Sequence, residues 1–400
     1  MSTRTSLAGS STQSPRYLSG LFLNPTAHRR AAKNSLLRAI LYPLLLACSI
    51  ASPAANAGLF SSPEEDAEEL EQHKTALQLE IDALRRTQNV LFPLVKAATT
   101  LCGSDAAWSY GFGVAGRDRF KGDLKTAAPF LGFDKQVGVL YVAKASPAEQ
   151  AGLRTGDVVV AIEGEKVRED TDAYEDAERQ IKRQADTGAP LSLTILRNGE
   201  PAQFTLSPAK VCDYKLEVTR NSLPAAATSG WTLYVTTGLL DFTEDDAELA
   251  SVLSHEIAHS LMSHVKKKFG NLALGTVADL ALQAAAGPIG GLFVAAIKPA
   301  AQVGARANLQ GFELEADYVG LYIMALAEYP TEDTAMLWRR LAVEFPQFIQ
   351  GSYWGTHPST PQRMLLLEET SKEINTKIAS SSPLLPELAS RMASWGKGNE

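Results

Sequence analysis

The sequence predicts an α+β protein. It combines a mainly helical domain that carries a small sheet with a β-rich domain inserted after a long N-terminal helix. Residues 63–100 place apolar side chains at helical spacing, residues 126–210 alternate short apolar runs with glycine turns, and residues 211–378 return to mostly helical periodicity. A chain of 400 residues that is 45% hydrophobic can bury more than one core. We therefore expect separate globular domains in one chain.

The first 57 residues have the pattern of a secretion signal. They contain six basic and no acidic residues, and they end in an apolar run over residues 39–50. This run is short for a bilayer span, and the sequence Ala-Asn-Ala at 55–57 predicts cleavage before Gly58. The alternative is a lipobox ending at Cys48, whose lipidation would anchor the protein to a membrane. Both interpretations predict an exported protein of the bacterial periplasm, soluble in the first case.

Loss of residues 1–57 would change the formal net charge from −7 to −13, because the segment holds six positive charges and no negative one. Such an acidic chain argues against nucleic acid as a partner. Cys102 and Cys212 would then be the remaining cysteines. An even pair in an exported protein is a disulfide candidate, and two buried thiols are the alternative.

The segment 58–103 is expected to form one long amphipathic helix. Acidic residues follow Pro63, where the dipole of a helix N-terminus favours them. We expect its apolar stripe to pack on the helical domain, with a coiled coil as the alternative. The stripe consists of Leu70, Leu77, Leu79, Ile81, Leu84 and Leu91.

The β-rich segment, residues 126–210, resembles a PDZ domain of the bacterial type. The resemblance rests on the segment SPAEQAGLRTGDVVVAIEGEKV at 146–167. After it we expect a helix at about 172–186 and a hairpin at Asn198-Gly199. The resemblance implies that a Φ-Gly-Φ loop, assigned to Leu131, Gly132 and Phe133, binds the C-terminal carboxylate of a peptide. The peptide would add to the sheet as a further strand. A small packing domain with a closed groove is the alternative.

Residues 211–378 form the second large block. Residues 231–237 alternate like a half-buried strand, and we expect this strand to be a sheet edge to which an extended substrate pairs. Residues 271–302 are rich in Ala, Gly and Leu and predict a helical hairpin near the active site or in contact with a membrane surface. Residues 379–400 are expected to be a short tail.

The segment HEIAH at 255–259 carries the chemistry. On a helix, residues i and i+4 face nearly the same way, so His255 and His259 can bind one metal ion. Glu256 lies beside the first ligand, where its carboxylate can reach a water on the metal rather than the metal itself. This spacing predicts a catalytic zinc site. Because a motif of three fixed residues can also occur by chance, the prediction needs support from a further ligand elsewhere in the sequence.

A catalytic zinc usually takes three protein ligands and leaves one position for water. The metzincin pattern is excluded, because Met262 and Val265 stand where it has glycine and histidine. His264 lies about 140° round the helix from His259, so we expect it at the surface. The third ligand must therefore come from further along the chain.

Downstream, the motif ELEAD at 313–317 places Glu313 and Asp317 on one face of an apolar helix. We expect Glu313 to be the third ligand and Asp317 to accept the second N–H of a ligand histidine. Glu315 points elsewhere and is expected to be solvated. The alternative is a pair of surface acids that bind lysine or arginine.

HEIAH, ELEAD and the later segment THPSTPQR at 356–363 together resemble the zinc peptidase family that includes the CAAX prenyl protease, HtpX and BepA, a gluzincin type, over residues 212–376. The resemblance supports Glu313 as ligand and Asp317 beside it. It also implies that His357 lies by the active site and that Arg363 starts a helix there. Many members have Ser-Arg shortly before the ligand glutamate, whereas Leu309-Gln310 stands here.

The expected function is a zinc endopeptidase with one Zn²⁺ per chain, in which Glu256 activates a zinc-bound water. His357 would stabilise the oxyanion or cover the zinc. The resemblance implies unfolded or misfolded envelope proteins as substrates and a role in quality control. The alternative is a catalytically silent or auto-inhibited, chaperone-like protein that binds peptides through its PDZ-like groove. Glu256 favours the peptidase, since a structural site needs no base.

Cys102 and Cys212 flank the PDZ-like segment, and the two ends of an inserted domain are usually neighbours. We therefore expect a disulfide between them at the neck of the insertion.

Overall fold

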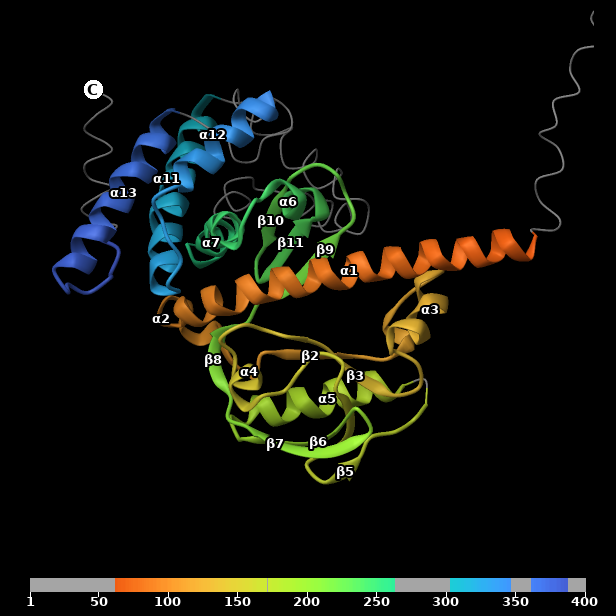
Figure 1. Cartoon of the computed structure of the whole chain (residues 1–400). Coiled ribbons are helices and arrows are strands. Elements are labelled where there is room, and N and C mark those ends of the chain that lie inside the picture. Colours follow the sequence, from red (N-terminus) through yellow and green to blue (C-terminus); the bar gives the residue numbers. More distant parts are fainter. Residues whose placement is uncertain (1–61, 171, 263–302, 347–360, 388–400) are drawn as a thin grey trace, which may run out of the picture. The chain divides into compact units, whose positions relative to one another are not determined.

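The computed structural model describes residues 62–170, 172–262, 303–346 and 361–387, with backbone alone at 303–310 (Figure 1). The segment 1–57, the segment 271–302, His264 and His357 lie outside the described residues. The described helices include none that is long and apolar enough to cross a bilayer.

The long N-terminal helix is present as α1, Pro63–Ala97, followed by the short α2, Thr99–Cys102, and the 3-10 helix η1, Gly103–Asp105. Glu64, Glu65 and Asp66 occupy its first turn, as the helix dipole favours. Its core-facing residues include Leu77, Ile81 and Leu91. Leu79, which we expected in the same stripe, is 64% exposed. Two residues along a helix turn a side chain by about 200°, so Leu77 and Leu79 face opposite sides.

The β-rich domain has a sheet in the order β2-β3-β4-β6-β7, with β5 also paired to β4. Between β2 and β3 lie η2 (Arg117–Arg119), α3 (Leu124–Ala127) and η3 (Ala128–Leu131), and α4 (Pro147–Ala151) precedes β4. The strands and the helix beside them are β2 (Phe112–Ala115), β3 (Val137–Val142), β4 (Val158–Ile162), β5 (Glu165–Lys166), α5 (Ala173–Asp186), β6 (Leu191–Arg197) and β7 (Glu200–Leu206).

Two local expectations for this domain are met. Asn198 and Gly199 both have positive φ, 55° and 83°, as the two-residue β6–β7 hairpin requires. The helix expected at about 172–186 is α5. The domain begins earlier than residue 126, however, because β2 is part of its sheet. Four residues with two glycine neighbours give too weak an alternation to show a strand in the sequence.

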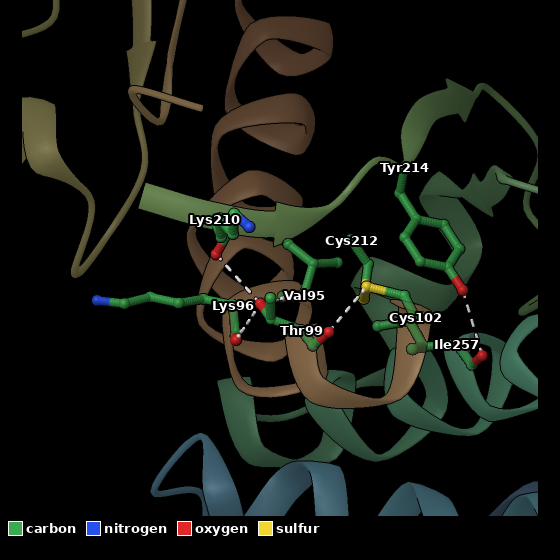
Figure 2. Close-up of a disulfide and its surroundings, with 8 residues drawn as sticks. All are labelled: Val95, Lys96, Thr99, Cys102, Lys210, Cys212, Tyr214 and Ile257. Carbon is green, nitrogen blue, oxygen red and sulfur yellow. Dashed lines mark hydrogen bonds between the residues drawn. A yellow bond between two sulfur atoms is a disulfide. The ribbon is translucent and has the colours of Figure 1, made fainter. Parts of the chain in front are cut away.

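A two-stranded ribbon forms the neck of this domain. Strand β1, Ala106–Ser109, pairs antiparallel with β8, Ala209–Cys212, so the chain enters and leaves the domain side by side. Cys102 and Cys212 form a disulfide there, with Cα atoms 5.9 Å apart across 110 residues (Figure 2). The expected disulfide at the neck of the insertion is thus confirmed.

The remaining elements form the helical domain with its small sheet. The sheet order is β10-β11-β9, with β9 (Lys215–Thr219) parallel and β10 (Ala226–Ser229) antiparallel to β11 (Thr232–Thr236). The helices are α6 (Thr237–Phe242), α7 (Asp246–Leu261), α11 (Val303–Leu326), α12 (Thr334–Glu344) and α13 (Pro361–Ala379). The expectation that residues 231–237 form an edge was wrong, because β9 pairs with β11 on its second side.

One core joins α1 to the helical domain. Residues Val90 to Cys102 share a buried cluster with side chains of β11, α7, α11, α12 and α13. The β-rich domain has its own core, built from its sheet and the inner face of α5. A third, smaller cluster packs the earlier half of α1 against the segment between β2 and β3. Helix α1 therefore belongs to the helical domain and also contacts the inserted one.

Candidate active site

Helix α7 carries HEIAH, and its start is fixed by side-chain caps. The Asp245 carboxylate accepts a hydrogen bond from the Glu248 N–H at 2.9 Å, and the Glu248 carboxylate accepts one from the Glu244 N–H at 2.7 Å. These bonds satisfy N–H groups that a helix start leaves without partners. From Leu249 to Ser260 every residue is buried. The two histidines are therefore presented from inside the domain.

Three potential metal-ligating side chains converge at this site. The Nε2 atoms of His255 and His259 are 3.1 Å apart. Glu313 of α11 places Oε2 3.3 Å from His255 Nε2 and Oε1 3.4 Å from His259 Nε2. Bonds of about 2.0–2.1 Å to a tetrahedral ion would separate the ligand atoms by about 3.3–3.4 Å. The donor set and its spacing fit zinc, and the structure brings together the three residues expected to bind it.

Asp317 and Arg363 contact the side chains of this triad. Asp317 Oδ1 lies 2.9 Å from His255 Nδ1, the position expected for an acceptor of its second N–H. Arg363, in the first turn of α13, donates to Asp317 through Nε at 2.6 Å and Nη2 at 2.7 Å. Its Nη1 lies 3.5 Å from Glu313 Oε2. A buried arginine thus compensates the negative charge of both carboxylates.

The pKa values of His255 and Asp317 reflect this arrangement. Burial disfavours the charged form of His255, but the hydrogen bonds to Asp317 and Glu313 outweigh it and raise the pKa of the imidazole to about 9. Burial would raise the pKa of Asp317, yet the Arg363 guanidinium and the His255 ring lower it. Asp317 is therefore a stable anion beside the ligand histidine.

Trp338 and Gly320 support the site and were not anticipated from the sequence. The Trp338 ring on α12 lies 5.3 Å from the His255 ring and 4.6 Å from the Arg363 guanidinium carbon. A Cβ added to Gly320 would come within 3.2–3.3 Å of the His255 backbone, so glycine lets α11 approach α7 closely. The spacing of Gly320 three residues after Asp317 is the signal that could have indicated this role.

Glu256 is buried beside His255 on α7, with 2% of its surface exposed. Glu315 corrects an expectation, because it is only 5% exposed rather than solvated. Helix α11 packs against both α7 and α13, so a residue between Glu313 and Asp317 does not reach solvent.

The Φ-Gly-Φ assignment to residues 131–133 is not met. The N–H groups of Gly132 and Phe133, which were to bind a carboxylate, donate to Pro129 O at 3.2 Å and to Ala128 O at 3.0 Å. Phe133 is buried in the cluster that faces α1. A Leu-Gly-Phe pattern here closes a 3-10 turn.

A second Φ-Gly-Φ sequence, Tyr110 to Phe112, leads directly into β2, which ends the sheet. The Ala143 N–H donates to Gly111 O at 2.8 Å, and Phe112 pairs with Val142. Because an antiparallel ladder alternates, the N–H and C=O of Phe112 point away from β3. The sheet edge next to a Φ-Gly-Φ loop is therefore at β2.

The site has the arrangement of a gluzincin metal centre, in which an HExxH helix supplies two histidines and a second helix supplies a glutamate. Residues 202–371 match the model of peptidase family M48, and residues 112–207 match the PDZ domain model. The match to family M48 therefore covers the helical domain, and the match to the PDZ domain covers the domain inserted before it.

Among curated proteins, the chain is similar to the mitochondrial metalloendopeptidase OMA1. It is 28% identical to that of Schizosaccharomyces pombe over 42% of this chain and 50% of the relative, and 28% identical to that of Arabidopsis thaliana over 35% and 27%. A putative zinc metalloprotease of Thermotoga maritima is 38% identical over 18% of this chain and 13% of the relative. The chain thus spans half or less of the length of these relatives.

Two solved structures are similar to part of the chain. The HtrA3 PDZ domain bound to a phage-derived ligand is 20% identical over 26% of this chain and 88% of that one, with a TM-score of 0.20. The HtrA-type protease AlgW with a decapeptide is 23% identical over 26% and 30%, also with a TM-score of 0.20.

Proposed function

We propose that the protein is a zinc-dependent endopeptidase. The observation that carries this proposal is the buried triad of His255, His259 and Glu313, whose ligand atoms all lie within 4.8 Å of one another. These three residues would hold a zinc ion, which would supply Lewis-acid chemistry by making a water more acidic and polarising a peptide carbonyl. Asp317 Oδ1 lies 2.9 Å from His255 Nδ1 and would keep the proton on that nitrogen, so that Nε2 is available as a ligand atom.

Glu256 is proposed as the general base. It follows a ligand histidine on the same helix and is buried, so its carboxylate is shielded from bulk water. It would take a proton from the attacking water and pass it to the leaving amine. His357 is proposed, from the family resemblance alone, to stabilise the oxyanion or to cover the metal in a resting state.

We propose that an extended substrate pairs with β10. This strand is an edge of the sheet, and it contacts α7. The Thr236 N–H donates to Ala225 O at 3.0 Å, so the alternation of the ladder directs the N–H and C=O of Ala226 and Thr228 away from β11. Backbone pairing at these two residues would bind many sequences with little preference.

For the PDZ domain we propose that peptide C-termini bind at the edge of β2, with the carboxylate at the loop from Tyr110 to Phe112. The basis is the direction of the Phe112 backbone groups and the position of this loop at the start of an edge strand. A C-terminal peptide that binds the wild type but not after amidation of its carboxylate would support this assignment. Equal binding of both forms would refute it.

The cellular role is a proposal from the sequence. The signal pattern supports export to a bacterial periplasm, with lipid attachment at Cys48 as the alternative. Unfolded or misfolded envelope proteins are the proposed substrates, and quality control is the proposed role. A second candidate function is peptide binding without catalysis, which the matched PDZ domain favours.

The test compares the purified protein with Glu256→Gln and, as a matched control, Glu217→Gln on the exposed face of β9. Zinc content is measured together with cleavage of casein. We expect one zinc in all three proteins and cleavage in the wild type and the control only. Cleavage that survives in Glu256→Gln would refute the general base. Bound zinc with no cleavage in any of the three proteins would favour the second function.

A further inference from the structure

The tip of the β10–β11 hairpin is fastened to the last turn of α7 by one side chain. Ser260, the residue after His259, donates its hydroxyl to Gly230 O at 2.6 Å. Its Oγ also lies 2.7 Å from Thr228 Oγ1. Ser260 is 9% exposed, so water competes little for these bonds.

The two hydroxyls and the Gly230 carbonyl form one hydrogen-bonded group. Gly230 O can only accept, and it lies 2.6 Å from Ser260 Oγ and 3.1 Å from Thr228 Oγ1. Either hydroxyl can donate to the other across the 2.7 Å contact, while the second one donates to the carbonyl. In both arrangements Ser260 and Thr228 are linked to each other and to the hairpin backbone, and loss of either hydroxyl loosens the attachment.

Tyr214 provides a second attachment between the same two elements. Its hydroxyl donates to the carbonyl of Ile257, within HEIAH, at 3.2 Å (Figure 2). Its ring meets Trp231 at the hairpin tip edge to face, with centroids 4.9 Å apart. The hairpin tip and the last turn of α7 are therefore joined at two places.

Thr228 belongs to both parts of this arrangement. Its backbone groups point away from β11, at the edge proposed for substrate pairing, while its side chain bonds to Ser260. We propose that Ser260 is a positioning residue that, through Thr228 and Gly230, sets the distance between the substrate-binding edge and the metal-ligating histidines. This inference rests on the proposed peptidase function.

The test uses the full chain loaded with zinc and two hydroxamate probes, read by calorimetry. A four-residue peptide hydroxamate needs both the metal and the strand edge, whereas acetohydroxamate needs the metal alone. Thr228→Val removes the hydroxyl but keeps the branched shape that strands favour, and Thr228→Ser retains the hydroxyl. Thr205→Val, on exposed β7 of the PDZ domain, is the matched control.

We expect Thr228→Val to lower the affinity for the peptide hydroxamate by about 3- to 10-fold, which corresponds to the net free energy of one hydrogen bond. Acetohydroxamate affinity and zinc content should not change, and Thr228→Ser should restore tight binding. Unchanged affinity for the peptide probe in Thr228→Val, or an equal loss of both probes, would overturn the proposal. So would a peptide probe that binds wild type no more tightly than acetohydroxamate.

Amide hydrogen exchange provides a readout that needs no metal. Thr228→Val should speed exchange over residues 226–236, while Thr228→Ser and Thr205→Val should match the wild type. Unchanged exchange in Thr228→Val would overturn the proposal on its own. A wild type that binds no zinc would contradict the proposed peptidase function, which zinc analysis detects separately, and exchange would still decide on the Ser260 attachment.

Discussion

Arg363 and Asp317 form a bidentate ion pair in which both side chains are 1% exposed. Asp317 Oδ1 is shared with His255 Nδ1, and Arg363 also approaches Glu313. A single guanidinium on α13 therefore orients one ligand through Asp317 and contacts another directly. The resemblance implies that Arg363 stands behind the metal ligands at the start of a helix, and Arg363 lies in the first turn of α13.

Replacement of Arg363 by methionine, which keeps much of its volume, should be strongly destabilising. Asp317 and Glu313 would remain buried without a compensating cation, and breaking such a pair usually costs about 3–5 kcal/mol. Urea unfolding of Arg363→Met measures this loss. Arg339→Met is the control, because the side chains of Arg339 and Glu368 are 42% and 37% exposed and their ion pair should be worth at most about 1 kcal/mol. Similar losses in both variants would contradict the role assigned to Arg363.

Gly320 offers a test of how closely α11 must approach α7. A Cβ at this position meets backbone atoms of His255 and Ser254 at 3.2–3.3 Å, so the helices must separate by a few tenths of an ångström. We expect Gly320→Ala to lower zinc affinity about 10- to 100-fold, as disturbed support of ligands does. A competing chelator titration measures the change.

Gly311, in the same helix, is the matched control for this substitution. No described atom lies within 4 Å of a Cβ built there. Gly311→Ala should therefore leave zinc affinity unchanged and stabilise the helix by up to about 1 kcal/mol through propensity. If both alanine variants keep wild-type zinc affinity, the close approach at Gly320 is not needed by the site.

The metal triad could be predicted because helical spacing is a local property. His255 and His259 share a face of one helix, and Glu313 and Asp317 share a face of another. Because the helix around these two acids is mostly apolar, the sequence indicates that the acids are buried and have partners. Trp338 could not be predicted this way. Its contact with His255 depends on how α12 packs, and no spacing within α12 records that packing.

The strand order of the small sheet and the identity of the carboxylate-binding loop also could not be predicted from local sequence patterns. Residues 232–236 look the same at an edge or in the middle of a sheet, because parallel pairing with residues 215–219 leaves no mark within the strand. Likewise, Leu131-Gly132-Phe133 and Tyr110-Gly111-Phe112 fit one pattern equally well. The distinction comes from tertiary structure, because residues 110–112 lead into the edge strand β2, whereas residues 131–133 close a 3-10 turn.

Removal of the metal should destabilise the peptidase domain reversibly. An ion that binds only the folded state stabilises it by about 4 kcal/mol at a thousand times its dissociation constant. A chelator should therefore lower the Tm, and added zinc should restore it. His259→Ala should show no zinc-dependent change in Tm, because one of the three ligands is missing. A zinc-dependent rise in that variant equal to the wild-type rise would place the ion elsewhere.

The disulfide between Cys102 and Cys212 should contribute to stability by closing a loop of 110 residues. In the chain-entropy model such a loop is worth about 4–5 kcal/mol, and removal of a native disulfide typically costs 2–5 kcal/mol. We expect the double variant Cys102→Ser/Cys212→Ser to lose about that much in urea unfolding, and wild type with reductant to match it. Thiol titration of denatured, unreduced full-length protein should find one thiol, Cys48, and three after reduction. Three thiols before reduction would show that the neck is held by the β1–β8 ribbon without a covalent bond.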